Sequence, residues 1–169
     1  MGDFKIDANS VINKFTKMMD FTQNMRPLFS TLLGDPGGAP DDWTIRGGLK
    51  SSFEGERGPS DETWPALSKD YKKWKDKHFS PDLTKLFLTG KLYESLVNTN
   101  EYTVDIETNT KLIFGTSIVY GAALQFGYPE RNLPPRPFIG LSEDRKTMID
   151  LQIRKYLTDA FNINAARAT

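Results

Sequence analysis

The segment of residues 111–142 constrains this chain more than any other, because glycines and prolines fix much of its backbone. An apolar run at 112–114 predicts a strand, and the Gly-Thr-Ser sequence at 115–117 is expected to end it. Apolar residues then recur with helical spacing from Ile118 to Phe126, and Gly127 is placed to end that helix in a left-handed conformation. The segment therefore predicts a strand, a break and a short helix in direct succession.

Prolines dominate the next part of this segment, which reads LPPRPF at 133–138. Each proline fixes its own φ angle and disfavours a helical conformation in the residue before it. We therefore expect an extended arm at 133–138 that is rigid without being regular. Arg136 is held between two prolines. It is expected to pair with a carboxylate or with backbone carbonyl oxygens, either in its own subunit or across an interface.

Residues 1–33 predict a long N-terminal helix with a wide apolar face. Pro27 is expected to kink or split this helix, because a proline inside a helix removes a hydrogen bond and clashes with the preceding turn. The face can pack in the core of its own subunit or, in part, on a neighbouring subunit. Its main residues recur at three- and four-residue steps: Val11, Phe15, Met18, Met25, Phe29 and Leu32.

Two loops and two capped helices are expected next. Residues 34–40 form a loop, after which Asp41 or Asp42 is placed to cap a helix running from Trp43 towards residue 53. Residues 54–63 form a second surface loop, expected to be poorly ordered in the free protein. Trp64 should bring the chain back to the core, and Ser68 should cap a helix that ends near residue 77.

The second half of the chain predicts a bend at Gly90, a helix at 91–98 and a β-hairpin. Residues 102–107 alternate apolar and polar side chains, which predicts a half-buried strand paired with residues 111–115 across a turn at 109–110. Ser142 should cap a last helix at 143–161, with a flexible tail at 162–169. These elements predict one α+β domain of residues 1–169, in which a small, mainly antiparallel sheet with one or two further strands packs against several helices.

The composition excludes most kinds of chemistry. The chain has no cysteine and one histidine, His78, so disulfides and sites with two imidazoles are ruled out. The acidic pairs at 41–42 and 61–62 are expected to be solvent-facing caps, because adjacent residues seldom converge on one point. No catalytic, cofactor-binding or metal-binding residue is predicted. With 22 Lys+Arg against 22 Asp+Glu, net charge favours neither nucleic acid nor a membrane, and we find neither a signal peptide nor an apolar run of membrane length.

The predicted helix at 69–77 combines lysines with two aromatic residues, Tyr71 and Trp74, on one face. Such a helix can follow phosphates by charge and stacking. It can equally be a solvated face whose lysines meet acidic groups on a partner, which the zero net charge of the chain favours. All of its lysines are expected to be exposed: Lys69, Lys72, Lys73, Lys75 and Lys77.

Three short motifs resemble the virion morphogenesis family of tailed phages, which includes the tail-completion proteins of Mu-like phages. They are GTSIVYGAALQFG with LPPRPFIGLS at 115–142, WPALS at 64–68, and LTGKLYESL at 88–96. Leu124 stands where the family often has histidine, and Pro135 where alanine is common. The likeness covers residues 43–161 and is far more specific than one short motif.

This resemblance implies a structural virion protein of the head–tail junction, or neck, that completes the tail and enables its joining to the capsid connector. It implies a hexameric ring, or a monomer before assembly, in contact with tail tube or tail terminator proteins and with connector proteins. It implies no enzyme activity, membrane or specific nucleic acid, although genomic DNA can pass nearby. The location would be the virion, and the host cytoplasm during assembly. A nucleic-acid-binding or enzymatic factor using residues 69–77 is the alternative. The residues proposed for the interface are Tyr120, Gln125, Phe126, Pro135, Arg136, Pro137 and Phe138.

Overall fold

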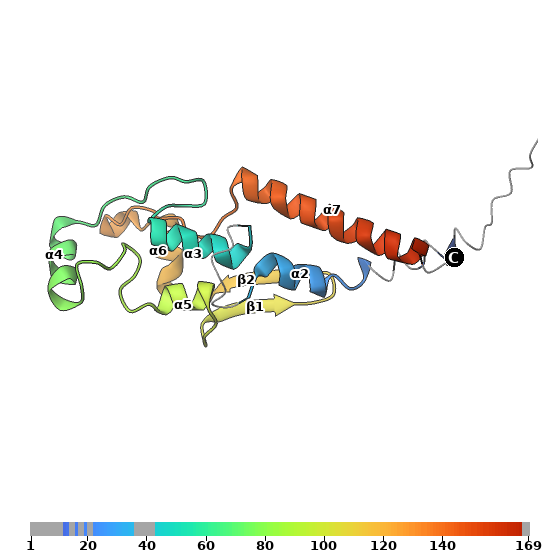
Figure 1. The fold of residues 1–169 in the computed structure, drawn as a ribbon. Helices are drawn as coiled ribbons and strands as arrows, with labels where there is room; N and C mark the ends of the chain where they lie inside the picture. Colours follow the sequence, from blue (N-terminus) through green and yellow to red (C-terminus); the bar gives the residue numbers. More distant parts are fainter. Residues whose placement is uncertain (1–11, 14–15, 17–18, 20–21, 36–42, 167–169) are drawn as a thin grey trace, which may run out of the picture.

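The computed structural model describes residues 12–13, 16, 19, 22–35 and 43–166. They form several helices and one antiparallel hairpin, which confirms the α+β class (Figure 1). No further strand is found among these residues, so the expectation of a larger sheet was wrong. In chain order the elements are α2 (Arg26–Leu33), α3 (Ile45–Gly55), α4 (Lys69–His78), α5 (Lys91–Val97), β1 (Thr103–Glu107), β2 (Leu112–Thr116), α6 (Val119–Phe126), a 3₁₀ turn (Pro129–Arg131) and α7 (Glu143–Ala166).

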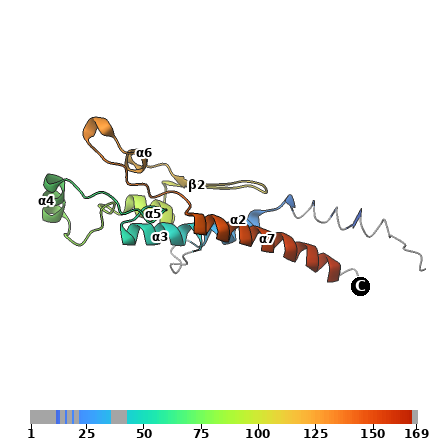
Figure 2. The same cartoon turned by 90° about the horizontal axis from the view of Figure 1, so that it is seen from above.

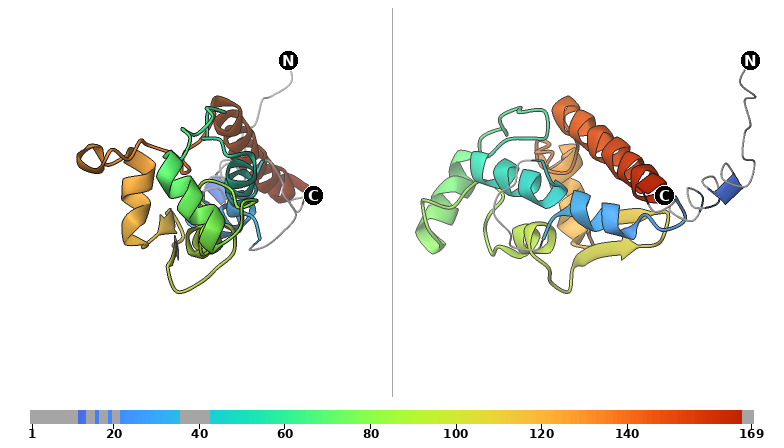
Figure 3. Two further views of the ribbon diagram at one scale, coloured as in Figure 1. Left: turned by 90° about the vertical axis from the view of Figure 1, so that its left-hand side faces the viewer. Right: turned by 45° about the vertical axis from the view of Figure 1, so that its right-hand side comes forward.

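The elements are arranged along one long axis. Helix α4 lies at one end, and α7 runs from the middle towards the other end, beside α2 (Figure 1). Seen from above, the hairpin and α6 occupy one flank, while α3 and α7 occupy the other (Figure 2). The loop that follows α6 stands out from the body (Figure 3). The segment at 115–142 is therefore presented on one side of the molecule.

The core forms where α3, α5 and the chain around Trp64 meet. The ring of Phe53 touches three other rings, with centroids 5.8 Å from Trp64, 5.6 Å from Tyr93 and 5.8 Å from Phe138. Trp64 was predicted to return the chain to the core, and it is 1% exposed. The buried apolar residues of this cluster are Leu49, Phe53, Trp64, Leu92, Leu96, Val97, Ile118 and Phe138.

The hairpin has the predicted pairing, but its faces are not those that the alternation indicates. Strand β2 continues to Thr116, so the predicted break comes only at Ser117. Ile106 lies opposite Ile113 in the register, and these side chains are 51% and 38% exposed. The opposite face, with Asp105 beside Phe114, turns towards α3, where the buried Arg46 pairs with the partly exposed Asp105 and lies over the Phe114 ring.

The N-terminal region is divided before Pro27. The described residues at 12, 13, 16, 19 and 22 are helical, residues 24–25 are not, and α2 begins at Arg26 with the proline in its first turn. The described residues thus show the predicted split and do not confirm one long helix. Val11, Phe15 and Met18 of the predicted apolar face lie outside them. Three residues of α2 are buried: Leu28, Leu32 and Leu33.

Short polar side chains cap the starts of α3, α4 and α7. Ser68 and Ser142 cap α4 and α7 as predicted. Each hydroxyl accepts a hydrogen bond from the backbone amide three residues later, that of Tyr71 and that of Arg145. Helix α3 is capped by Thr44 instead of Asp41 or Asp42, which lie outside the described residues. Helix α7 continues to Ala166, beyond its predicted end at residue 161.

Candidate assembly surface

Arg136 fastens the proline-rich arm to the body of its own chain. Its Nε donates to the Pro65 carbonyl oxygen at 3.0 Å, and its Nη2 donates to the Ala66 carbonyl oxygen at 2.9 Å. The side chain is 3% exposed, and its burial lowers the pKa of the guanidinium. In return, the Trp64 indole donates to the Pro137 carbonyl oxygen at 2.7 Å. Of the pairings predicted for Arg136, the structure shows the one with carbonyl groups of the same subunit.

Gln125 joins helix α6 to the end of the same arm. Its Oε1 accepts hydrogen bonds from the backbone amides of Phe138 at 2.9 Å and Ile139 at 3.0 Å. Its Nε2 donates to the Ile139 carbonyl oxygen at 2.9 Å. The backbone amide of Arg136 also donates to the Leu124 carbonyl oxygen at 2.7 Å. Helix α6 and the arm therefore form one hydrogen-bonded unit.

Gly127 lets the chain turn sharply between these two parts. Its φ of 80° is positive, as predicted, although its ψ of 172° is extended and not left-handed helical. A Cβ at this position would lie 2.9 Å from the Pro135 nitrogen, closer than real side chains approach. The loop that follows is closed by two backbone hydrogen bonds between Tyr128 and Leu133. A larger residue at 127 would thus push α6 and the arm apart.

The outward face of α6 is apolar and uncovered. Val119 is 93% exposed and Phe126 is 78% exposed, and Ala122 between them is exposed too. Their spacing of three and four residues places them on one side of the helix. The opposite side is buried at Gly121, where an added Cβ would touch Leu92. A helix that is apolar on both sides is normally covered on both sides.

The seven residues proposed for an interface thus fall into two groups. Arg136 and Phe138 are buried, and Pro137 and Gln125 are partly buried in contacts within the chain. Phe126 and Pro135 are exposed, and Tyr120 is 47% exposed with its hydroxyl bonded to the Thr89 side chain. Val119 was missed, although its place on the apolar helix was visible in the sequence. The buried group holds the segment in shape, and the contact of the exposed group with another subunit stays a prediction.

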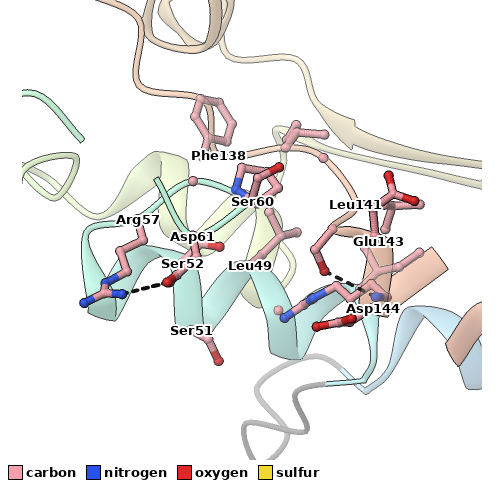
Figure 4. Close-up of a pocket in the computed structure, with 18 of the residues that line it drawn as sticks. Leu49, Ser51, Ser52, Arg57, Ser60, Asp61, Phe138, Leu141, Glu143 and Asp144 are labelled. Carbon is pink, nitrogen blue, oxygen red and sulfur yellow. Dashed lines mark hydrogen bonds and ion pairs between the residues drawn. The ribbon is translucent and has the colours of Figure 1, made fainter. Parts of the chain in front are cut away.

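A separate groove of about 680 Å³ runs between α3, the loop at 57–61 and the start of α7 (Figure 4). Leu49, Phe114 and Phe138 lie in its lining, and Ile139 and Leu141 line it as well while remaining 41% and 39% exposed. Its lining also contains charged side chains from the 57–61 loop and from the first turn of α7: Arg57, Asp61, Glu143, Asp144 and Arg145. The groove is therefore apolar with a polar rim, which is the form of many sites that accept a peptide or helix.

Helix α4 carries exposed aromatic rings, but its lysines are not all exposed. The rings of Tyr71 and Trp74 stack at 5.7 Å, and Trp74 stacks on His78 at 5.2 Å. Lys75 is 1% exposed and donates to the carbonyl oxygens of residues 83 and 84, which corrects the expectation that it faces solvent. Its burial lowers the pKa of its ammonium group. Lys72 is paired with Asp76. The cationic surface available for phosphates is therefore smaller than the sequence indicated.

The described part of the chain has neither a cluster of metal-binding side chains nor a membrane-spanning helix. No three histidine or acidic side chains gather there as a metal site would require. No helix among those residues is long and apolar enough to cross a membrane.

Comparison with known proteins gives one match. The sequence model described as the phage virion morphogenesis family matches residues 42–158, which is more than half of the chain. Neither the curated proteins nor the solved structures gave a significant match. The matched range begins just before α3 and ends within α7, so it contains the hydrogen-bonded unit, the exposed face of α6 and the groove.

Proposed function

We propose a role for this chain from the premise that it belongs to the phage virion morphogenesis family. The family indicates a structural or assembly protein of the phage virion, and not an enzyme. Within that class, we propose that the chain acts at the head–tail junction, where it completes the tail and enables the tail to join the capsid connector. The observation that carries this proposal is the uncovered apolar face of α6.

The exposed face of α6 favours a permanent protein contact. Burying a side chain such as Phe126 or Val119 contributes about 1.5 to 3 kcal/mol, so leaving both in water forgoes a large gain. Interfaces commonly centre on a few apolar or aromatic residues of this kind. Forming the contact would also lose little conformational entropy, because Arg136 and Gln125 already hold the arm and α6 in place.

The proposed partners are further copies of the chain in a hexameric ring, tail tube or tail terminator proteins, and connector proteins. The exposed α6 surface would meet one of these structural proteins, and the groove beside α3 remains for another contact. We place the protein in the virion, at the tail or the head–tail interface, with assembly taking place in the host cytoplasm. We propose no membrane contact and no specific nucleic acid.

Replacing Val119 and Phe126 together by serine tests this role. Both side chains are exposed, so the purified subunit should keep its melting temperature, because such surface changes are worth within about 0.5 kcal/mol. A phage that carries the double variant should yield separate filled heads and unjoined tails by electron microscopy.

A matched control is Leu151→Ser on α7, an exposed apolar residue away from α6. It should leave the titre of infectious particles unchanged. Normal titres from the folded α6 double variant would refute the proposed role of this face.

A further inference from the structure

We propose that the N-terminal segment (residues 1–22) of one copy binds in the groove beside α3 of a second copy. The inference rests on the proposed function, since it describes how copies of an assembly protein join. Two of the described residues of the segment, Ile12 and Met19, carry apolar side chains that are largely exposed. Ile12 is 59% exposed and Met19 is 61% exposed. Both are helical, and their separation of seven residues places them on one side of a helix.

The groove offers a surface that matches such a segment. Apolar side chains line it, and two of these, Ile139 and Leu141, remain substantially exposed in the single chain. An amphipathic helix places its apolar residues into a groove of this kind and leaves its polar side in water. Covering Ile139 and Leu141 would remove from water the same type of surface that Ile12 and Met19 expose.

Part of the charge near the two surfaces is complementary. Glu143 and Asp144 are exposed in the first turn of α7, at the groove. In the sequence, Lys14 and Lys17 stand beside the apolar positions of the segment. Opposite charges at the rim of an interface fix the orientation and register of the contact.

The place where the segment leaves the body favours a second copy over the same chain. The Tyr156 hydroxyl donates to the Asn24 carbonyl oxygen at 3.2 Å, and the Met25 amide donates to the Asn109 carbonyl oxygen at 2.7 Å. Along α7, Tyr156 is roughly 20 Å from Glu143 at the groove, given the rise per residue of a helix. The described residues before Asn24, drawn in blue, lie beyond the end of α2 on the side away from α3 (Figures 2 and 3).

A contact of this kind joins different surfaces of successive copies. Repeated head-to-tail contacts form a closed ring when the rotation between copies closes, and an open filament when it does not. The inference therefore supplies a specific contact for a ring of the chain, independent of the α6 face that is proposed to meet other virion proteins.

Engineered cysteines test the contact directly, because the chain has none of its own. One batch of full-length protein carries Ile12→Cys and a second, of different tag length, carries Leu141→Cys. After mixing and mild oxidation, we expect a disulfide-linked heterodimer to form at least about tenfold faster than from the control pair, because adjacent thiols react at a high effective concentration. The control pair joins Asn13→Cys, on another side of the segment, with the same Leu141→Cys protein.

Equal rates for the two pairs, or no heterodimer, would overturn the inference whatever the association state of the protein. A protein that carries both Ile12→Cys and Leu141→Cys adds a second test. If it closes a disulfide within one chain at high dilution, the segment fills its own groove, which also overturns the proposal. The Val119 and Phe126 double-serine variant should crosslink normally, so failure here and failure of the proposed α6 role give different results.

Discussion

At the scale of single residues, three buried cations hold distant parts of this chain together. Arg46, Lys75 and Arg136 are each 3% exposed or less, and each donates to backbone carbonyl oxygens of another segment. Arg46 also pairs with Asp105 at 3.1 Å and lies over the Phe114 ring. Removing such a cation leaves buried acceptors without donors, which costs more than the hydrogen bonds themselves contributed. Stability therefore depends strongly on these three positions.

The sequence could reveal only part of this. Two prolines around Arg136 showed that it would be held rigidly, and carbonyl partners were among the expected pairings. Nothing in the local sequence indicated that Lys75 is buried, because it stands among exposed lysines on a helix. Its burial comes from the 80–88 segment, which folds over α4 and supplies the carbonyl oxygens that Lys75 contacts. Arg46 was not singled out, since its carbonyl partners and Asp105 lie 50 or more residues away.

Replacing Arg136 by alanine should destabilise the isolated subunit. The change removes the donors from the carbonyl oxygens of Pro65 and Ala66, and we expect a loss of about 3 kcal/mol, because each bond involves a charged donor in a buried place. Urea unfolding followed by circular dichroism measures this loss.

Arg131→Ala is the control for this prediction. Arg131 is exposed and lies over the Tyr128 ring at 5.8 Å, so its loss should change stability by less than about 0.5 kcal/mol. If Arg136→Ala unfolded at the same urea concentration as the control, the buried arginine would not be fastening the arm.

At the scale of elements, local patterns predicted which helices and strands form better than which faces they bury. The spacing of apolar residues gave α4, α5, α6, α7 and the pairing of β1 with β2. It could not show that Ile106 faces outward, because the contacts of Asp105 and Phe114 on the other face are with Arg46 of α3, a residue distant in the sequence. The groove beside α3 was not predicted either, since its lining comes from four separate segments of the chain.

The contact between Arg145 of α7 and helix α3 requires a glycine at position 48. The Arg145 guanidinium crosses α3 there, where a Cβ would lie 0.9 Å from Nη1, and Nη1 donates to the Thr44 carbonyl oxygen at 3.1 Å. Gly48→Ala should therefore displace Arg145, and the lost contact should offset the gain of about 1 kcal/mol that alanine gives inside a helix.

A double-mutant cycle with Arg145→Ala isolates this contact. Once the guanidinium is absent, Gly48→Ala should stabilise the protein by the full gain of about 1 kcal/mol, measured by urea unfolding. An identical effect of Gly48→Ala with and without Arg145 would show that the guanidinium does not occupy this position.

At the scale of the whole molecule, the described part of the chain leaves apolar surfaces in water, among them the face of α6 and the groove beside α3. The chain belongs to the phage virion morphogenesis family, and exposed apolar surfaces often mark contacts with other proteins. The motifs in the sequence predicted this role from their resemblance. They could not separate the residues that shape the segment from those that remain exposed, because Arg136 and Phe126 stand ten residues apart in one motif and only the fold buries the first.

Photo-crosslinking from position 126 in assembled phage tests the central claim most directly. A photoreactive phenylalanine analogue replaces Phe126 in one phage and Trp74 of α4 in another, since both side chains are exposed. We predict that illumination of purified virions links position 126 to a tail or connector protein, while position 74 gives no such product. The account would be contradicted if virions that contain the protein gave no product from position 126 but gave products from position 74 to protein or DNA. That result would assign the contact to α4.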